Sequence, residues 1–300
     1  MCDKINLGSC RLCPRRCGVN RLQAAGFCGA GAQMRVAKAM LHHGEEPCIG
    51  GEAGAGAVFF SGCNLRCVFC QNYEISWENH GWPVSEARLA EILLHLQEQG
   101  ACCIDLVSPT PYTLQLKAVL TAVKPELRIP VVYNCGGYEE PEALRLLEGL
   151  IDVYLPDLKY FDRGVAARYC GCADYFEKAQ AALQEMYRQV GACELDAQGL
   201  LRKGLLVRHL VLPGAYKDSM ELMKWLGEAF PAESIRMSLL SQYTPFGRAE
   251  EYPEINRRVT TYEYEKVIDQ ALASGLIGYR QERSSSTMAL RPEFDGEGIL

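Results

Sequence analysis

Short apolar segments recur along the chain from residue 57 onward, and each has the length of a buried β-strand. They lie at residues 57–60, 102–107, 131–133, 151–155, 205–212 and 235–240. Runs of this length, bounded by polar or glycine-containing segments, are typical of strands covered on both faces. We therefore predict six buried strands.

The segments between these strands have the apolar spacing of helices. Between residues 89 and 96, apolar side chains follow i, i+3, i+4, i+7, with Ser85 placed as an N-cap and Gly100 as a stop. The same period recurs at 116–123, 141–150, 179–190 and 264–271. Alternating strands and helices imply parallel strands joined by right-handed crossovers. Six strands are too few for an eight-stranded barrel, so we predict an α/β fold, a partial (β/α)6 TIM-like barrel with its function at the strand C-terminal ends.

The first fifty residues differ from the rest because they contain no long apolar element and carry six cysteines. A glycine-rich passage at 50–56 follows and is typical of a turn or linker. We predict two domains, a Cys-rich N-terminal extension at 1–52 and the partial barrel at 53–300. Cys2 is expected to fray with the terminus, and the serines at 284–286 to form a short polar loop.

The cysteine content changes the picture, because 15 of 300 residues are cysteine. The start of the chain lacks the basic and apolar blocks of a signal peptide, and no apolar run reaches the roughly 18 to 20 residues of a membrane span. We therefore expect a cytoplasmic protein without membrane contact, whose reduced thiols bind metal or pack in the interior. The net charge of −6 argues against a nucleic-acid partner.

Three cysteines follow the first predicted strand in a C-x3-C-x2-C pattern, Cys63, Cys67 and Cys70. Three thiolates on one tight loop can bind three irons of a [4Fe–4S] cluster and leave the fourth iron open for chemistry. Zinc is the alternative, although three thiolates without a nearby fourth ligand suit it less well. The loop follows a strand C-terminal end, where a barrel places its active site.

A second cysteine set lies in the N-terminal extension, at Cys10, Cys13, Cys17 and Cys28. Four thiols near turn-forming glycines predict a second metal site, either zinc or an iron–sulfur cluster, and the spacing does not decide between them. The arginines of this segment would stabilise thiolates.

The cysteine loop resembles the radical S-adenosylmethionine (SAM) superfamily, whose motif is C-x3-C-x-aromatic-C, with Phe69 in the aromatic place. The wider strings 45–47, 59–63 and 70–76 are similar to the branch of pyruvate formate-lyase activating enzymes. The resemblance implies an iron–sulfur enzyme that binds SAM at the open iron, cleaves it reductively to a 5′-deoxyadenosyl radical and abstracts hydrogen from a substrate.

The resemblance also implies which residues contact SAM. Ser108 and Thr110 stand where the family places Gly-Gly-Glu for the SAM amino group, although a proline-fixed turn explains them equally well. Asn134 replaces an aspartate near the SAM carboxylate and a monovalent cation, so the oxygen stays and the charge is lost. Asp157 and Lys159 match the family's Asp-x-Lys, with a surface ion pair as the alternative. The complete set of implied cofactor contacts is Phe69, Ser108, Thr110, Asn134, Asp157, Lys159 and Arg208.

Three functions compete at this point. The first is an activase that abstracts hydrogen from a glycine of a partner glycyl radical enzyme, with a reducing flavodoxin or ferredoxin as electron donor. The second is a radical SAM enzyme that modifies a small molecule or peptide, favoured by the departures at Ser108, Thr110 and Asn134. The third, a metal-stabilised nucleic-acid-binding module, is opposed by the acidic charge balance.

Overall fold

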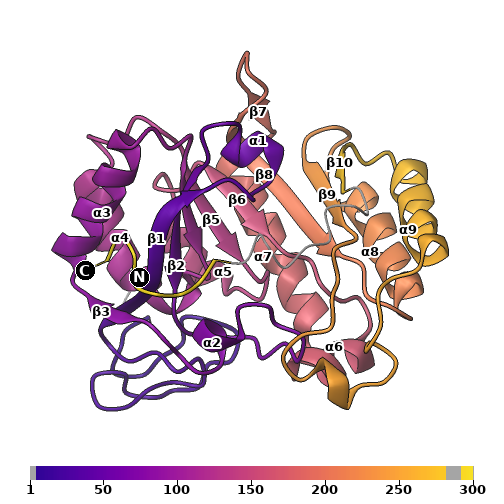
Figure 1. Ribbon diagram of the computed structural model, residues 1–300, viewed down its shortest axis with the longest axis horizontal. Helices are drawn as coiled ribbons and strands as arrows, with labels where there is room; N and C mark the ends of the chain where they lie inside the picture. Colours follow the sequence, from indigo (N-terminus) through magenta and orange to yellow (C-terminus); the bar gives the residue numbers. More distant parts are fainter. Residues whose placement is uncertain (1–4, 282–291, 300) are drawn as a thin grey trace.

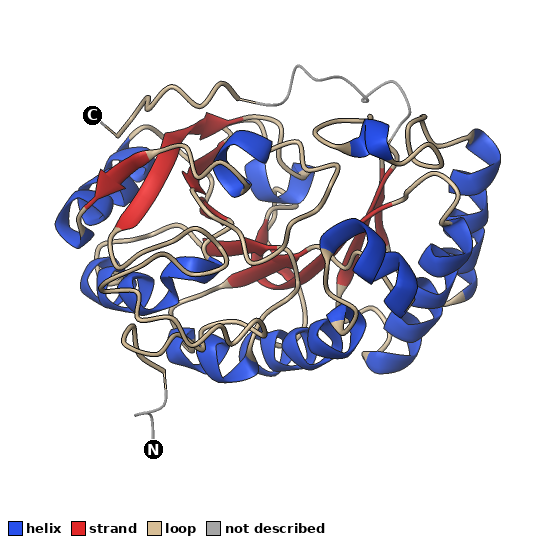
Figure 2. Ribbon diagram, turned by 90° about the horizontal axis from the view of Figure 1, so that it is seen from below, coloured by secondary structure: helices blue, strands red, loops and turns tan. Residues whose placement is uncertain are grey.

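The computed structural model describes residues 5–281 and 292–299. Cys2 and the serines at 284–286, for which we made predictions above, lie outside these residues. Within them, one curved sheet has helices packed against its outer face, as Figures 1 and 2 show. This arrangement confirms the predicted α/β fold.

The sheet runs in the order β10-β9-β8-β6-β5-β4-β2-β1-β3, and β7 pairs with β8 outside this path. From β2 to β10 all neighbours are parallel, whereas β1 pairs antiparallel with both β2 and β3. The strands are β1 Met34–His42, β2 Ala55–Phe60, β3 Trp82–Val84, β4 Ile104–Val107, β5 Val131–Cys135, β6 Val153–Pro156, β7 Glu194–Leu195, β8 Leu201–Leu210, β9 Arg236–Leu240 and β10 Gly278–Arg280. The six predicted strands correspond to β2, β4, β5, β6, β8 and β9.

Helices cover the outer face of the sheet because each turns one apolar side inward. In α3, Leu89, Ile92, Leu93 and Leu96 are buried, and the Arg88 amide donates to the Ser85 side chain, as the N-cap position predicts. The helices are α1 Pro47–Gly50, α2 Tyr73–Ser76, α3 Glu86–Glu98, α4 Thr113–Val123, α5 Pro141–Leu144, α6 Arg163–Cys170, α7 Tyr175–Val190, α8 Tyr216–Ala229 and α9 Thr261–Ala273. None of the helices in the described part of the chain has the length and apolarity needed to cross a membrane.

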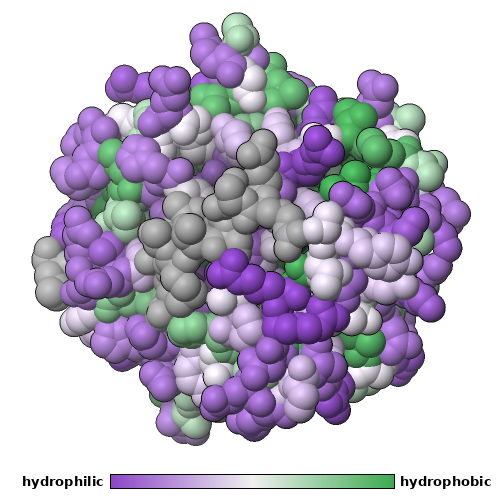
Figure 3. All heavy atoms as spheres, turned by 45° about the vertical axis from the view of Figure 1, so that its right-hand side comes forward, coloured by the Kyte–Doolittle hydropathy of each residue, from purple (hydrophilic) through white to green (hydrophobic). Residues whose placement is uncertain are grey.

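The outward faces of the helices are mostly polar. In α9, Tyr264, Val267 and Ala271 are buried, and Tyr262 and Leu272 are exposed apolar side chains. The face in Figure 3 is correspondingly dominated by hydrophilic residues, with apolar residues in separate spots. Isolated exposed apolar residues are normal on a protein surface and need no functional explanation.

The N-terminal region contributes a strand that the apolar pattern does not predict. Residues 5–33 form loops without helix or strand, and β1 then joins the barrel sheet by pairing with β2 over Val36–His42. Because β1 runs antiparallel to β2, it ends beside the start of β2, at the N-terminal end of the barrel strands. The following residues therefore reach the barrel interior from the end opposite the Cys63–Cys70 loop, with α1 at the top of Figure 1 and α2 at the bottom.

Candidate functional site

The loop that joins β2 to α2 brings Cys63, Cys67 and Cys70 together. The Leu65 amide donates to the Cys63 sulfur at 3.4 Å, and the Ser76 hydroxyl donates to the Cys70 sulfur at 3.2 Å. The Cys70 amide donates to the Cys67 carbonyl at 3.2 Å, which closes a turn between these two cysteines. The loop therefore presents its three thiols as one group, with donors already aimed at two sulfurs.

Burial and a nearby lysine determine how readily these three thiols lose their protons. Burial raises the pKa of the Cys67 thiol to about 12 and also raises the pKa of Cys63 and Cys70, although the Lys159 ammonium counteracts this in each case. Buried thiols ionise when a metal replaces their protons. Three thiols on one loop are the donor set that a [4Fe–4S] cluster with one open iron requires, so the residues fit this group.

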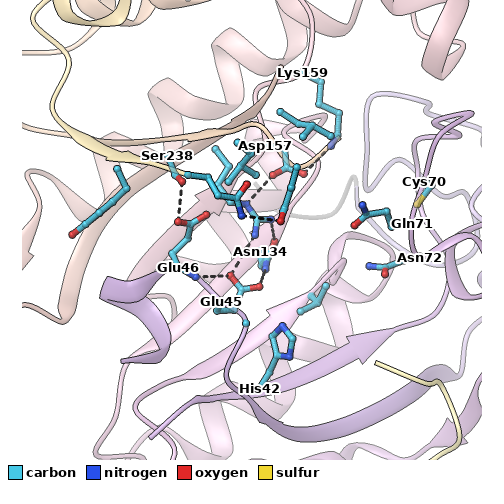
Figure 4. A pocket seen from close by; sticks show the side chains of 18 of the residues that line it. His42, Glu45, Glu46, Cys70, Gln71, Asn72, Asn134, Asp157, Lys159 and Ser238 are labelled. Atoms are coloured by element: carbon cyan, nitrogen blue, oxygen red, sulfur yellow. Dashed lines mark hydrogen bonds and ion pairs between the residues drawn. The ribbon is translucent and has the colours of Figure 1, made fainter. Parts of the chain in front are cut away.

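A pocket of about 770 Å³ opens beside the loop. Cys67, Cys70 and Phe69 line one part of it, and Figure 4 shows Cys70 with Gln71 and Asn72 facing the cavity. The pocket runs into the barrel interior as far as the segment between β1 and α1. Its volume lies within the range of pockets that hold cofactors and small substrates.

Four of the expected cofactor contacts line this pocket together and form a connected network. The Arg208 side chain donates from Nε to Asp157 Oδ1 at 2.9 Å and from Nη2 to Asn134 Oδ1 at 2.5 Å. Lys159 Nζ donates to the other Asp157 oxygen at 2.7 Å. Burial raises the pKa of Asp157, but Arg208 and Lys159 outweigh it, so the pKa lies below its ordinary value. Asp157 is therefore an anion held between two cations.

The other three expected contacts are placed differently. Phe69 lines the pocket and packs edge-on against Tyr243, with ring centroids 5.5 Å apart. Ser108 adopts a left-handed backbone (φ 58°), and its amide donates to the Asn134 carbonyl at 2.8 Å. The Thr110 hydroxyl donates to the buried Glu139 carboxyl at 2.6 Å. Neither Ser108 nor Thr110 lines the large pocket, although the Ser108 backbone contacts that of Asn134.

Sequence reasoning missed two carboxylates that complete the network. Glu45, from the segment after β1, lies 3.4 Å from Arg208 Nη1 and accepts from Asn134 Nδ2 at 3.4 Å. Asp105 on β4 accepts from the same Asn134 nitrogen at 3.2 Å, and its second oxygen has no partner among the described residues. Burial, with Glu45 adding to it, raises the pKa of Asp105. The sequence contained one indication of this role, because Asp105 is the only charged residue in the apolar run 102–107.

A third carboxylate, Glu46, extends the polar lining on the same side of the pocket. It accepts from the Ser238 hydroxyl at 2.8 Å (Figure 4), and burial raises its pKa although Arg208 counteracts this. The pocket is therefore lined by Cys67 and Cys70 on one side and by Glu45 and Glu46, from the segment between β1 and α1, on another.

The four N-terminal cysteines, Cys10, Cys13, Cys17 and Cys28, all line one small cavity of about 10 Å³. Burial raises the pKa of Cys13 to about 12. Thr110 and Asn64 also line this cavity, and Asn64 follows the first cysteine of the other set directly. In residues 5–281 and 292–299, no group of three or more His, Cys, Asp or Glu side chains is already arranged around one metal-ion position.

Arg15 connects the N-terminal segment to the cysteine loop. Its Nε donates to the Asn64 carbonyl at 3.0 Å, and Nη1 donates to the Gly171 carbonyl at 3.0 Å. Its Nη2 lies 2.8 Å from the Cys172 sulfur. A hydrogen bond from Cys170 lowers the pKa of Cys172 despite burial, and Arg15 adds to this effect. The two cysteine sets are thus parts of one packed region.

Comparison with known families agrees with the chemistry of the loop. The profile of the radical SAM superfamily matches residues 57–226, a stretch that contains Cys63, Cys67, Cys70 and the Asn134–Arg208 network. An uncharacterized protein from Methanocaldococcus jannaschii is 30% identical over 275 residues, which cover 88% of this chain and 74% of that protein.

Solved structures share the fold. The Streptococcus suis protein SuiB, solved with its precursor peptide SuiA, is 15% identical with a TM-score of 0.52 over 76% of this chain and 48% of SuiB. HydG, a maturase of the [FeFe]-hydrogenase, is 14% identical with a TM-score of 0.51 over 72% of this chain and 48% of HydG. In both comparisons this chain matches less than half of the other protein.

Proposed function

The chain belongs to the radical SAM superfamily, and from this premise we propose that it is an activating enzyme that abstracts hydrogen from a glycine of a partner enzyme. The supporting observation is that Cys67 and Cys70 border the same pocket as Asp157, Lys159 and Arg208. The activating role rests on the resemblance of the loop and its flanking strings to that branch of the superfamily.

In this proposal, Cys63, Cys67 and Cys70 hold a [4Fe–4S] cluster, and SAM occupies the adjoining part of the pocket. When bound, the cluster supplies one electron that cleaves SAM into methionine and a 5′-deoxyadenosyl radical. Lys159 and Arg208 provide positive charge for the SAM carboxylate, and Asp157 fixes the position of both cations. Phe69 and other apolar residues of the pocket wall keep water away from the reacting atoms.

Electron paramagnetic resonance tests the activating role. The reconstituted and reduced protein is incubated with SAM and a candidate glycyl radical enzyme, and the proposal predicts a glycyl radical on the partner. The same mixture with Cys67→Ala protein should give no signal. An absence of signal on every candidate partner, from protein that cleaves SAM, would overturn the activating role.

A second candidate is favoured by the charged lining of the pocket. Glu45 and Glu46 border the cavity from the segment between β1 and α1, and they are not among the expected SAM contacts. A glycine backbone carries no charge, so these carboxylates suit a small polar substrate better. Mass spectrometry of products made with deuterium-labelled candidates distinguishes the two, because label transferred into 5′-deoxyadenosine identifies the hydrogen donor.

We also propose that Cys10, Cys13, Cys17 and Cys28 bind a second metal, as zinc or as an iron–sulfur cluster. The support is that all four side chains line one cavity. Metal binding would draw the four sulfurs closer together, and because thiol protons would be lost, it would be stronger at higher pH. Iron, zinc and sulfide counts on wild-type and Cys13→Ala protein identify the metal, and equal counts in the two proteins would contradict the site.

A further inference from the structure

One hydroxyl in the interior of the protein has no hydrogen-bond partner. The Tyr160 side chain is completely buried, and no atom of the described residues accepts the proton of its hydroxyl at hydrogen-bonding geometry. It is the only hydroxyl among the buried, unpartnered polar atoms in that part of the chain. An unpaired polar group in the interior lowers the stability of a fold, so its presence indicates a partner that the chain alone does not supply.

Aromatic packing fixes the position of this hydroxyl. The Tyr160 ring packs edge-on against Tyr175 of α7, with ring centroids 5.4 Å apart, and lies 6.5 Å from the Tyr169 ring of α6. Both neighbours are themselves held by hydrogen bonds. The Tyr175 hydroxyl donates to the Asp157 carbonyl at 2.7 Å, and the Tyr169 hydroxyl donates to the Glu254 carboxylate at 2.9 Å. The Tyr160 ring is therefore confined, and its hydroxyl keeps one direction.

The thiol next to this hydroxyl is that of Cys67. Burial raises the pKa of Tyr160, and Cys67 is the neighbour that adds most to this effect. Burial also raises the pKa of Cys67, whereas Lys159 and the Tyr160 hydroxyl act in the opposite direction. Tyr160 therefore favours the thiolate form of Cys67, which is the form that binds iron.

The other two sulfurs of the cysteine loop already accept a hydrogen bond. The Leu65 amide donates to the Cys63 sulfur at 3.4 Å, and the Ser76 hydroxyl donates to the Cys70 sulfur at 3.2 Å. Within residues 5–281 and 292–299, no comparable bond reaches the Cys67 sulfur. An unpartnered donor thus lies beside the one sulfur of the loop that lacks a donor.

Tyr160 reaches Cys67 from outside the large pocket. The preceding residue, Lys159, lines the pocket (Figure 4), whereas Tyr160 does not line it and packs against α6 and α7. On the proposed function, SAM occupies the pocket. SAM bound there would leave the approach of the Tyr160 hydroxyl to the Cys67 sulfur unblocked.

We propose that Tyr160 donates a hydrogen bond to the Cys67 sulfur when the cluster is bound, and that this bond raises the reduction potential of the cluster. The reduced cluster carries one more negative charge than the oxidised cluster, so a donor at a sulfur stabilises the reduced form more. Reduction adds one electron to the cluster, and Tyr160 keeps its proton. This inference rests on the proposed function, because it requires a redox cluster at Cys63, Cys67 and Cys70.

A redox titration of the reconstituted protein, followed by electron paramagnetic resonance of the reduced cluster, tests this bond. Tyr160→Phe keeps the ring and removes the donor, so the one-electron equilibrium should shift about tenfold towards the oxidised form, a fall of about 59 mV. Tyr169→Phe is the matched control, because its ring lies beside that of Tyr160 and its hydroxyl bonds to Glu254 instead. The control should keep the wild-type potential. An unchanged potential in Tyr160→Phe, or an equal fall in both variants, would overturn the proposed role of Tyr160.

Urea unfolding of the metal-free protein gives a readout that does not depend on the cluster. Tyr160→Phe removes an unpartnered buried hydroxyl, so its unfolding equilibrium constant should be at least about fivefold smaller than that of the wild type. Tyr169→Phe removes a bonded hydroxyl and should be no more stable than the wild type. Metal-free Tyr160→Phe protein that is no more stable than the wild type would show that the chain itself satisfies this hydroxyl, and the proposal would fail.

A second substitution decides the question if Tyr160→Phe protein does not bind a cluster. Replacing Tyr160 by 3-fluorotyrosine keeps the hydroxyl and makes it a stronger acid and a stronger hydrogen-bond donor. The reduction potential should then rise above that of the wild type. A potential equal to or below the wild-type value would contradict the hydrogen bond. Wild-type protein that binds no reducible cluster overturns the proposed function instead.

Discussion

Lys159 Nζ lies 2.7 Å from Asp157 Oδ2, while Arg208 Nε lies 2.9 Å from Asp157 Oδ1. One half-buried carboxylate thus holds two cations on the wall of the large pocket, and Glu45 is a second anion of the group, 3.4 Å from Arg208 Nη1. Among the described residues Lys159 forms an ion pair with Asp157 alone, so its ammonium can also pair with a ligand carboxylate. The arrangement is therefore suited to anchor the amino-acid end of SAM next to the cysteine loop.

Removing the charge of Lys159 should weaken SAM binding. Lys159→Met retains the apolar stem, and we expect the Kd for SAM to rise at least about tenfold, because a charge-assisted contact in a buried site contributes about 1.5–3 kcal/mol. Equilibrium dialysis with the reconstituted protein measures the Kd. Lys124→Met is the control, since its pair with Asp152 at 2.6 Å lies outside the pocket. An unchanged Kd in Lys159→Met would show that this cation does not contact SAM.

Removing the charge of Asp157 should instead weaken the fold. Asp157→Asn removes the anion that Arg208 and Lys159 share, and because this pair is half-buried and Arg208 keeps Glu45, we expect a cost of about 2–3 kcal/mol, below that of a fully buried pair. Urea unfolding of the metal-free protein should give a loss of this size in the free energy of unfolding. A loss below about 1 kcal/mol, which is typical of surface pairs, would contradict the account of this network.

The two cysteine sets should respond differently to substitution. Cys13→Ala should mainly lower the yield of folded protein and the Tm, because the N-terminal segment has little apolar core of its own and would depend on the proposed metal and on contacts such as those of Arg15. Cys67→Ala should leave yield and Tm close to wild type and abolish SAM cleavage. Cys13→Ala protein with normal yield and Tm but no cleavage would contradict this division of roles.

Much of this architecture could be predicted from the sequence. Six strands, the N-cap at Ser85 and the cysteine loop depend on local patterns, and the structure confirms the predicted fold and the cap. Asn134, Asp157, Lys159 and Arg208 are the cofactor contacts that the resemblance to the radical SAM superfamily implies. The structure places all four around one pocket.

The parts that could not be predicted depend on partners distant in the chain. Lys38 interrupts the apolar residues of β1, and a lysine is expected to face solvent. The Lys38 side chain is nevertheless buried, because it pairs with Asp295 at 3.1 Å and with Glu297 at 2.9 Å. Glu45 likewise acquires its place in the network from Arg208, 163 residues later. No local pattern reports such a pairing, because a charged residue is expected to face solvent unless its partner is known.

His209 should make the fold sensitive to acid. It is buried, its Nδ1 lies 2.6 Å from the Leu158 carbonyl and its Nε2 lies 2.8 Å from the Ser219 hydroxyl. Burial lowers its pKa from 6.5 to about 4, although the bond to Leu158 acts in the opposite direction. The unfolded chain therefore binds a proton below about pH 6.5 that the folded chain takes up only near pH 4. The contribution of neutral His209 to the free energy of unfolding is therefore fully present above about pH 6.5, and it is lost as the pH falls from about 6.5 towards 4.

Urea unfolding at about pH 7.5 and about pH 5 measures this effect. Between these values His209 should account for a loss of about 2 kcal/mol in the free energy of unfolding. His209→Gln can keep both hydrogen bonds without titrating, so its loss should be smaller than that of the wild type by this amount. Equal losses in the two proteins would show that His209 does not carry the acid sensitivity.

The most direct measurement is the formation of 5′-deoxyadenosine by protein reconstituted with iron and sulfide without oxygen, reduced with dithionite and mixed with SAM. We predict a brown protein that releases 5′-deoxyadenosine and methionine. Cys63→Ala, Cys67→Ala and Cys70→Ala should each release none. A colourless preparation, or a fully loaded cluster that leaves SAM intact after reduction, would contradict the assignment of this loop as a radical SAM site.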